Sequence, residues 1–233
     1  MTLKQTFFTA LVVGVFSSVS VEGGEANTLS AEEKAAGWQL LFDGKSTKSW
    51  RLYGKDEFPA TGWVVEDGWL TKKGGIRAGN IITKETYSDF EFSWEWRMAE
   101  GGNNGVKYFV DAKRGELGHE YQMLAKPVEK PTKGATAGFY AVLAPGAHKP
   151  VNVAPEFNHS RILVQGDTVK HWLNGELVLE YTCGSEEVLA NVATSKFKKV
   201  KDFGKKVKAH IMLTDHKDEC SFRNLKIRRL SSE

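Results

Sequence analysis

The segment 118–124, with the sequence GHEYQML, places a carboxylate and a carboxamide together on one face of an expected β-strand. Side chains alternate between the two faces of a strand, so Glu120 and Gln122 point one way and the residues between them point the other. Burying both polar groups without partners is costly, and we therefore expect them to face outward. A carboxylate held there can act as a general base. The alternative is a solvated sheet surface that carries no chemistry.

Two basic side chains occupy equivalent positions on other expected strands. The alternation of FEFSWEWRM (90–98) sets Glu95 and Arg97 opposite a row of aromatic residues, and that of GVKYFV (105–110) sets Lys107 and Phe109 opposite Val106, Tyr108 and Val110. We expect Glu95, Arg97 and Lys107 to share the outward side of one β-layer with Glu120. Cations near a carboxylate can hold developing negative charge, or they can simply pair with it across the sheet.

Turns and alternating segments dominate the rest of the chain and indicate an all-β fold. Gly166-Asp167 and Asn174-Gly175 are hairpin turns that make 161–181 a meander, and 209–230 reads as a last hairpin with a bulge near Arg223-Asn224. Proline-rich connections surround one expected short strand at 137–143. A single sandwich or barrel is the simplest interpretation.

The beginning of the chain has the layout of a secretory signal peptide. Residues 1–20 hold one lysine, an apolar run too short to span a membrane, and small residues at the end. We expect cleavage near residue 20 and a periplasmic or secreted protein, with no membrane span in the mature chain. A leader follows at 21–36, in which Ser30 and Glu33 form a capping box for a short helix within 29–38.

The overall charge gives no reason to expect a nucleic-acid partner. The chain has 32 basic and 29 acidic residues, and loss of Lys4 with the signal peptide leaves a net charge of +2. The lysine-rich run 195–208 contains no recognisable nucleic-acid motif. Cys183 and Cys220 could pair in an exported protein or stay separate as small buried residues.

Six segments in order resemble the 3-keto-disaccharide hydrolase domain family. They are GWQLLFDGKSTKSWR, GGNNGVKYFV, GHEYQML, TAGFY, VKHWLNGELVLEY and LTDHKDECSFRNLKIR, and the resemblance runs over residues 37–230. The resemblance implies a concanavalin A-like jelly roll of two antiparallel sheets with a sugar groove. It also implies activity on 3-keto-glycosides, small sugars that a separate sugar 3-oxidoreductase has oxidised at C3.

The implied reaction needs three kinds of group. A ketone at C3 acidifies the C2 hydrogen, so a base can form an enolate that expels the C1 substituent, after which water adds. On this resemblance Glu120 is the expected base, His216 the acid, and Arg97 the group that stabilises the enolate. Lys107 can share that role or hold the substrate. The resemblance assigns sugar contacts to the remaining candidates, which are Gln122, Lys107, Asn104, Tyr140 and Asp215.

Other functions fit parts of the sequence. A non-catalytic, lectin-like carbohydrate-binding module on the same fold gains support from Ala125-Lys126-Pro127, where the family often has aspartates. A retaining β-glucanase needs two carboxylates about 5 Å apart, and the strand offers only Glu120. No cofactor is evident. A divalent cation polarising the ketone would fit the chemistry, although the spacing of His119, Glu120, Asp215 and His216 is not that of a zinc site.

Overall fold

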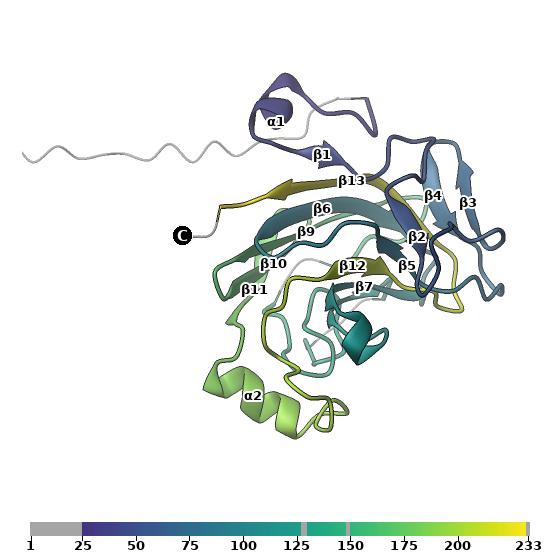
Figure 1. Ribbon diagram of the computed structural model, residues 1–233. Helices are drawn as coiled ribbons and strands as arrows, with labels where there is room; N and C mark the ends of the chain where they lie inside the picture. The colour runs from purple at the N-terminus through teal and green to yellow at the C-terminus, as the bar shows by residue number, and fades with distance from the viewer. Residues whose placement is uncertain (1–24, 127–129, 148–149, 232–233) are drawn as a thin grey trace, which may run out of the picture.

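The structure is a computed structural model that describes residues 25–126, 130–147 and 150–231. The expected signal peptide at 1–20 and the first part of the leader lie outside these residues. Two antiparallel sheets pack face to face (Figure 1), which confirms the jelly-roll sandwich expected from the sequence. In the described part of the chain, no helix is long and apolar enough to cross a membrane.

Sheet A is the larger layer. Its strand order is β11–β10–β9–β6–β13–β4–β3. Strand β1 also pairs with β13, on the edge of β13 that faces away from β6. The strands are β1 (Gln39–Leu40), β3 (Trp63–Glu66), β4 (Trp69–Lys72), β6 (Phe90–Arg97), β9 (Asn158–Gln165), β10 (Thr168–Leu173), β11 (Glu176–Thr182) and β13 (Cys220–Arg229).

Sheet B is the smaller layer and has the order β2–β5–β12–β7–β8. Its strands are β2 (Trp50–Leu52), β5 (Ile81–Thr83), β7 (Asn103–Val110), β8 (His119–Leu124) and β12 (His210–Leu213). A 3-10 turn, η1 (Ala112–Arg114), lies in the connection from β7 to β8. That connection makes the two strands antiparallel neighbours, with Lys107 opposite Glu120.

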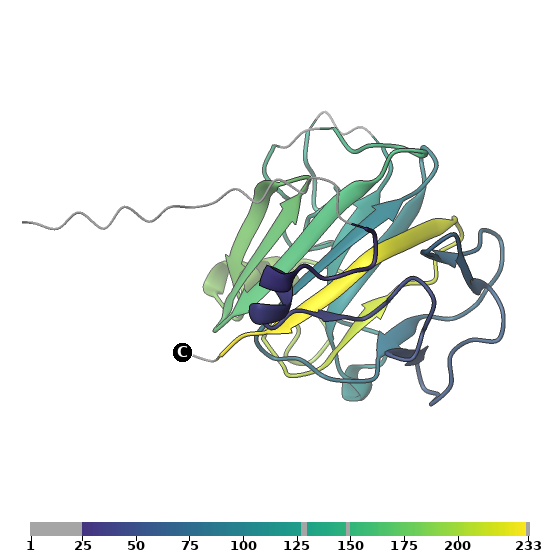
Figure 2. The same ribbon diagram turned by 90° about the horizontal axis from the view of Figure 1, so that it is seen from above.

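The short helices lie outside the two layers. Helix α1 (Ala31–Ala35) has the expected capping box between Ser30 and Glu33 and no buried residue, and it sits on the outer side of sheet A (Figure 2). Helix α2 (Glu186–Ala193) was not expected, although its N-cap Ser185 and two following glutamates are a helix-start signal. Both cysteines are buried and free, so they do not pair.

The two turn predictions in the meander are confirmed. Strands β9, β10 and β11 pair antiparallel in succession. Gly166, Asn174 and Gly175 adopt positive φ, the conformation that two-residue hairpin turns require. The bulge is confirmed as well, because the pairing of β13 with β6 shifts between Arg223 and Lys226.

Three local predictions are wrong. The segment 209–230 is not a hairpin, because β12 belongs to sheet B and β13 to sheet A, so 214–219 crosses between layers. Residues 137–143 form isolated bridges rather than a strand. Phe109 has φ +60° and enters the core while Val110 packs with Met212, so the alternation of 105–110 reverses at its end.

The core between the sheets is aromatic and contains a buried polar chain. Trp94 of β6 meets Tyr121 of β8 edge to face at 4.9 Å. The Tyr108 hydroxyl lies 2.8 Å from Nε2 of His171 and 2.7 Å from the Tyr181 hydroxyl, which in turn lies 2.8 Å from Nδ1 of His119. These contacts fix how the inner faces meet, and thereby which side chains must point outward.

Candidate active site on the outer face of sheet B

Glu120 and Gln122 lie on the outer face of sheet B, as expected. Tyr121 and Met123 are fully buried in the core, and alternation turns the two polar residues to the other side. The Glu120 side chain lies across Gly105, where an added Cβ would come within 2.5 Å of Oε1. Glycine at this position therefore lets the carboxylate lie close to the sheet.

The Glu120 carboxylate is buried without a fixed partner. The residue is 6% exposed, and within the described residues no hydrogen bond or ion pair reaches its oxygens. Burial raises the pKa of Glu120 above its ordinary value, and the charges of Lys107, His216 and Lys196 oppose part of that rise. A desolvated carboxylate surrounded by cations can bind and release a proton, as a general base must.

His216 reaches this region from the crossing segment between β12 and β13. The buried ammonium of Lys72 donates to its carbonyl oxygen and also pairs with Oδ1 of Asp215 at 2.9 Å. These contacts hold the backbone of the segment from which the imidazole of His216 projects. An imidazole can carry a proton at neutral pH and can therefore serve as a general acid.

Asp215 has a structural position rather than the substrate contact expected from the sequence. Its Oδ2 accepts hydrogen bonds from the amides of Ala78 (2.8 Å) and Gly79 (2.7 Å), while Oδ1 binds Lys72. Burial alone would raise the pKa of Asp215, but these donors outweigh it and lower the pKa. The carboxylate thus fixes the loop 73–80 and is already occupied.

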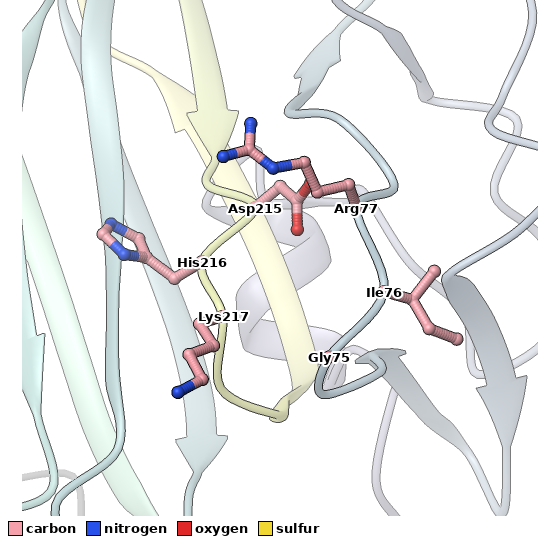
Figure 3. Close-up of a pocket in the computed structure, with 6 residues that line it drawn as sticks. All are labelled: Gly75, Ile76, Arg77, Asp215, His216 and Lys217. Carbon is pink, nitrogen blue, oxygen red and sulfur yellow. The ribbon is translucent and has the colours of Figure 1, made fainter.

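A cavity of about 430 Å³ opens beside His216. Figure 3 shows the imidazole of His216 and the guanidinium of Arg77 projecting to the same side of the segment 215–217, whereas Ile76 points away. The lining residues are Gly75, Ile76, Arg77, Asp215, His216 and Lys217. Arg77 was missed in the sequence because its glycine-rich loop matches no pattern with a known role.

Gln122 and Tyr140 join Glu120. The Gln122 side-chain amide donates to Oδ1 of Asn103 at 2.8 Å, and the backbone N–H of Tyr140 donates to the Glu120 carbonyl at 3.0 Å. The ammonium of Lys196 stands 4.1 Å above the Tyr140 ring. Lys196 was missed because it belongs to the lysine-rich run, which resembles ordinary solvated surface.

Arg97 does not belong to this site, which corrects the expectation from the sequence. It lies on β6 in sheet A, where its guanidinium stacks over Trp69 at 4.2 Å, and Glu95 pairs with Arg223 at 2.7 Å. Since the inner faces of β6 and β8 meet through Trp94 and Tyr121, their outer faces lie on opposite sides of the sandwich. Strand alternation defines a face, but it does not say which sheet carries that face.

Asn104 also departs from its expected role. It is fully buried and points inward, and its Oδ1 accepts hydrogen bonds from the Gly105 amide (2.8 Å) and the Thr214 hydroxyl (3.0 Å). It therefore ties β7 to the end of β12 instead of contacting a sugar. Its neighbour Asn103 faces outward beside Gln122.

The donor set around Glu120 does not suit a divalent cation. Among the described residues, no group of three or more histidine, cysteine, aspartate or glutamate side chains could hold a metal. The groups whose charge acts on Glu120 are Lys107, His216 and Lys196, and none of them is a carboxylate. Hard divalent ions take several oxygen ligands, and the groups that act on Glu120 do not form such a set.

The structure is thus a two-layer β-sandwich with a buried carboxylate on the outer face of sheet B and a cavity beside His216. The chain belongs to the 3-keto-alpha-glucoside-1,2-lyase-like domain family, whose sequence profile matches residues 37–228. It is 29% identical to the 3-keto-disaccharide hydrolase of Bacteroides thetaiotaomicron, covering 94% of this chain and 87% of that protein.

Two solved structures from Parabacteroides distasonis share the fold. Each is described as a "putative glycosyl hydrolase". The first has a TM-score of 0.76 and 30% identity, covering 89% of this chain and 100% of that chain. The second has a TM-score of 0.66 and 25% identity, covering 83% of this chain and 99% of that chain.

Proposed function

We propose that this protein is a glycoside-cleaving enzyme that acts on 3-keto-glycosides, with Glu120 as the general base. The observation that carries the proposal is the Glu120 carboxylate, which is 6% exposed, has a raised pKa, and feels the charges of Lys107, His216 and Lys196. The family and the name of the Bacteroides relative support the same class of substrate.

The proposed reaction begins with proton transfer. Glu120 removes the hydrogen from C2, and the electron pair of that C–H bond forms a C2–C3 double bond as the ketone becomes an enolate. Lys107 lies directly across the sheet from Glu120 and supplies positive charge for the enolate oxygen, the role first expected of Arg97. Lys196 adds to the same positive field.

Elimination and hydration complete the reaction. The enolate re-forms the ketone, a C1–C2 double bond appears, and the C1–O bond breaks while His216 protonates the leaving oxygen. Water then adds across the new double bond, with its oxygen at C1 and a proton at C2, so the net change is hydrolysis. The substrate must first be oxidised at C3, which requires an upstream sugar oxidoreductase. We also propose that the protein acts after export.

A direct glycosidase mechanism has less support. Retaining glucanases hold two carboxylates about 5 Å apart. In such a pair, the negative charge of one carboxylate raises the pKa of the other. Among the described residues, the groups whose charge acts on Glu120 are Lys107, His216 and Lys196, and they include no second carboxylate. The structure thus supports a single carboxylate that works with cations.

The decisive experiment compares a 3-keto-glucoside with its unoxidised parent. We expect cleavage of the keto sugar only, with deuterium from D₂O entering C2, and loss of both in Glu120→Gln. Glu180→Gln, an exposed glutamate paired with Lys170 at 3.3 Å, is the matched control and should keep activity. Cleavage of the parent sugar would instead support the glucanase, and binding without cleavage would support a lectin-like module.

A further inference from the structure

The loop that carries Arg77 is fixed to the segment that carries His216. The Gly75 amide donates to the Lys217 carbonyl at 2.8 Å, and the Ala78 and Gly79 amides donate to Asp215. Asn80 accepts from the Asp215 amide at 2.6 Å. These contacts lie on both sides of Arg77 in the chain, so its backbone cannot move independently of His216.

The cavity between them has an excess of positive charge. Arg77, Lys217 and His216 line it, and its one carboxylate, Asp215, is neutralised by Lys72. Lys72 is 1% exposed, so this ion pair is a fixed part of the wall. A volume of about 430 Å³ is within the range of small-molecule sites, roughly 300–1,000 Å³.

His216 stands at the border between this cavity and Glu120. It lines the cavity, and Thr214, two residues before it, exchanges hydrogen bonds of 3.0 and 3.1 Å with Gly105, against which the Glu120 side chain lies. Arg77 and Lys217 line the same cavity. For a substrate whose sugar ring lies at Glu120 and whose leaving oxygen lies at His216, the cavity lined by Arg77 is therefore open to the leaving group.

We propose that this cavity binds the leaving group of the glycoside and selects one that carries a carboxylate. The inference rests on the proposed function, because it takes His216 as the residue beside the scissile bond. The planar guanidinium of Arg77 can bind a carboxylate through two parallel hydrogen bonds, and Lys217 adds a second positive charge. Arg77 is thus a specificity-determining residue.

The test uses two aryl 3-keto-α-glucosides that differ only in a carboxylate or a carboxamide on the ring. We expect the wild-type protein to have a higher kcat/KM for the carboxylate. Arg77→Gln should reduce the carboxylate-to-amide ratio about tenfold, as expected for a hydrogen-bonded charge, while amide turnover stays within about twofold. Comparing ratios between proteins cancels the different leaving abilities of the two phenols.

Two further variants make the result specific. Arg77→Lys keeps the charge and should restore part of the ratio, and added salt should lower the ratio in the wild type. Arg229→Gln is the matched control, because that arginine lies on sheet A beside Glu85 and Tyr87. An unchanged ratio in Arg77→Gln, or no carboxylate preference in the wild type, overturns the inference even if both substrates are cleaved.

Calorimetric titration with the two unoxidised parent glycosides separates this inference from the proposed function. It measures the leaving-group preference without turnover. If neither keto sugar is cleaved, but the wild type binds the carboxylate parent more tightly and Arg77→Gln removes that preference, the proposed reaction is overturned and the binding site is kept. Equal Kd values for the two parents overturn the site.

Discussion

Replacing Gly105 by alanine tests the position of Glu120 without removing its carboxylate. A Cβ at this position would lie 2.5 Å from Oε1, 3.1 Å from Cγ and 3.2 Å from Cδ of Glu120. Ordinary van der Waals contact begins at about 3.4 Å, so Oε1 must move by about 0.9 Å. A displacement of about 1 Å at a reacting group costs on the order of 10²-fold in rate.

The same substitution should leave the protein folded. Gly105 does not have a positive φ, so alanine fits its backbone, and the atom that must move is the end of a flexible side chain. Alanine allows the unfolded chain fewer conformations than glycine does, which raises the free energy of unfolding by about 0.4–1 kcal/mol. This gain offsets the cost of moving Glu120. We therefore expect a melting temperature within a few degrees of the wild type.

The assay is kcat/KM on a 3-keto-glucoside, measured together with thermal unfolding. Gly146→Ala is the control, because its Cβ would meet only the Val178 carbonyl at 3.5 Å and its φ is not positive. We expect Gly105→Ala to lose about 10²-fold and Gly146→Ala to lose little. Wild-type activity in a stable Gly105→Ala protein would falsify the assignment of Glu120 as a precisely placed base.

Three further outcomes are expected. Because a base must be ionised, kcat/KM should fall on acidification, with a midpoint above pH 4.5. Lys107→Met should move this midpoint to higher pH, since it removes a charge that lowers the pKa of Glu120. An unmoved midpoint in the pH profile counts against an electrostatic effect of Lys107 on Glu120. Burial lowers the pKa of His171 from 6.5 to about 4, so between these pH values the unfolded state binds the proton more readily than the folded state. In denaturant unfolding, the contribution of this residue to the free energy of unfolding should be complete above pH 6.5 and should fall by about 3 kcal/mol toward pH 4. A flat profile contradicts the burial of His171 as a neutral group. When the full chain is expressed in a bacterium, N-terminal sequencing of the exported protein should find a new terminus near residue 21, and an uncleaved cytoplasmic product contradicts the signal-peptide prediction.

The sequence predicts the local parts of this fold well, because local geometry determines them. Turn residues with positive φ place the hairpins at Gly166 and Asn174, and the capping box places α1. The last hairpin failed for a different reason. Its polar tip at 214–219 looks like a turn, but whether two strands pair or enter different sheets depends on contacts far away in the chain.

The candidate site was predictable to the same extent. Alternation correctly turned Glu120 and Gln122 outward, and it also turned Arg97 outward, but on the other sheet. Arg77 and Lys196 enter the region from loops whose positions depend on hydrogen bonds with distant segments, such as that of Asp215 with Gly79. No periodicity in the sequence encodes such contacts.

The difference between the two outer faces explains why the proposed general base belongs to sheet B. On sheet A, Glu91 pairs with Arg161 and Arg228 at 2.6 Å each, and Glu95 pairs with Arg223. Guanidinium groups occupy the oxygens of these carboxylates and fix their orientation. Glu120 faces lysine and histidine charges without a direct ion pair, so burial dominates and its pKa rises. Both faces show the same alternating polar pattern in the sequence, and only the pairing of each carboxylate separates a structural surface from one that can transfer a proton.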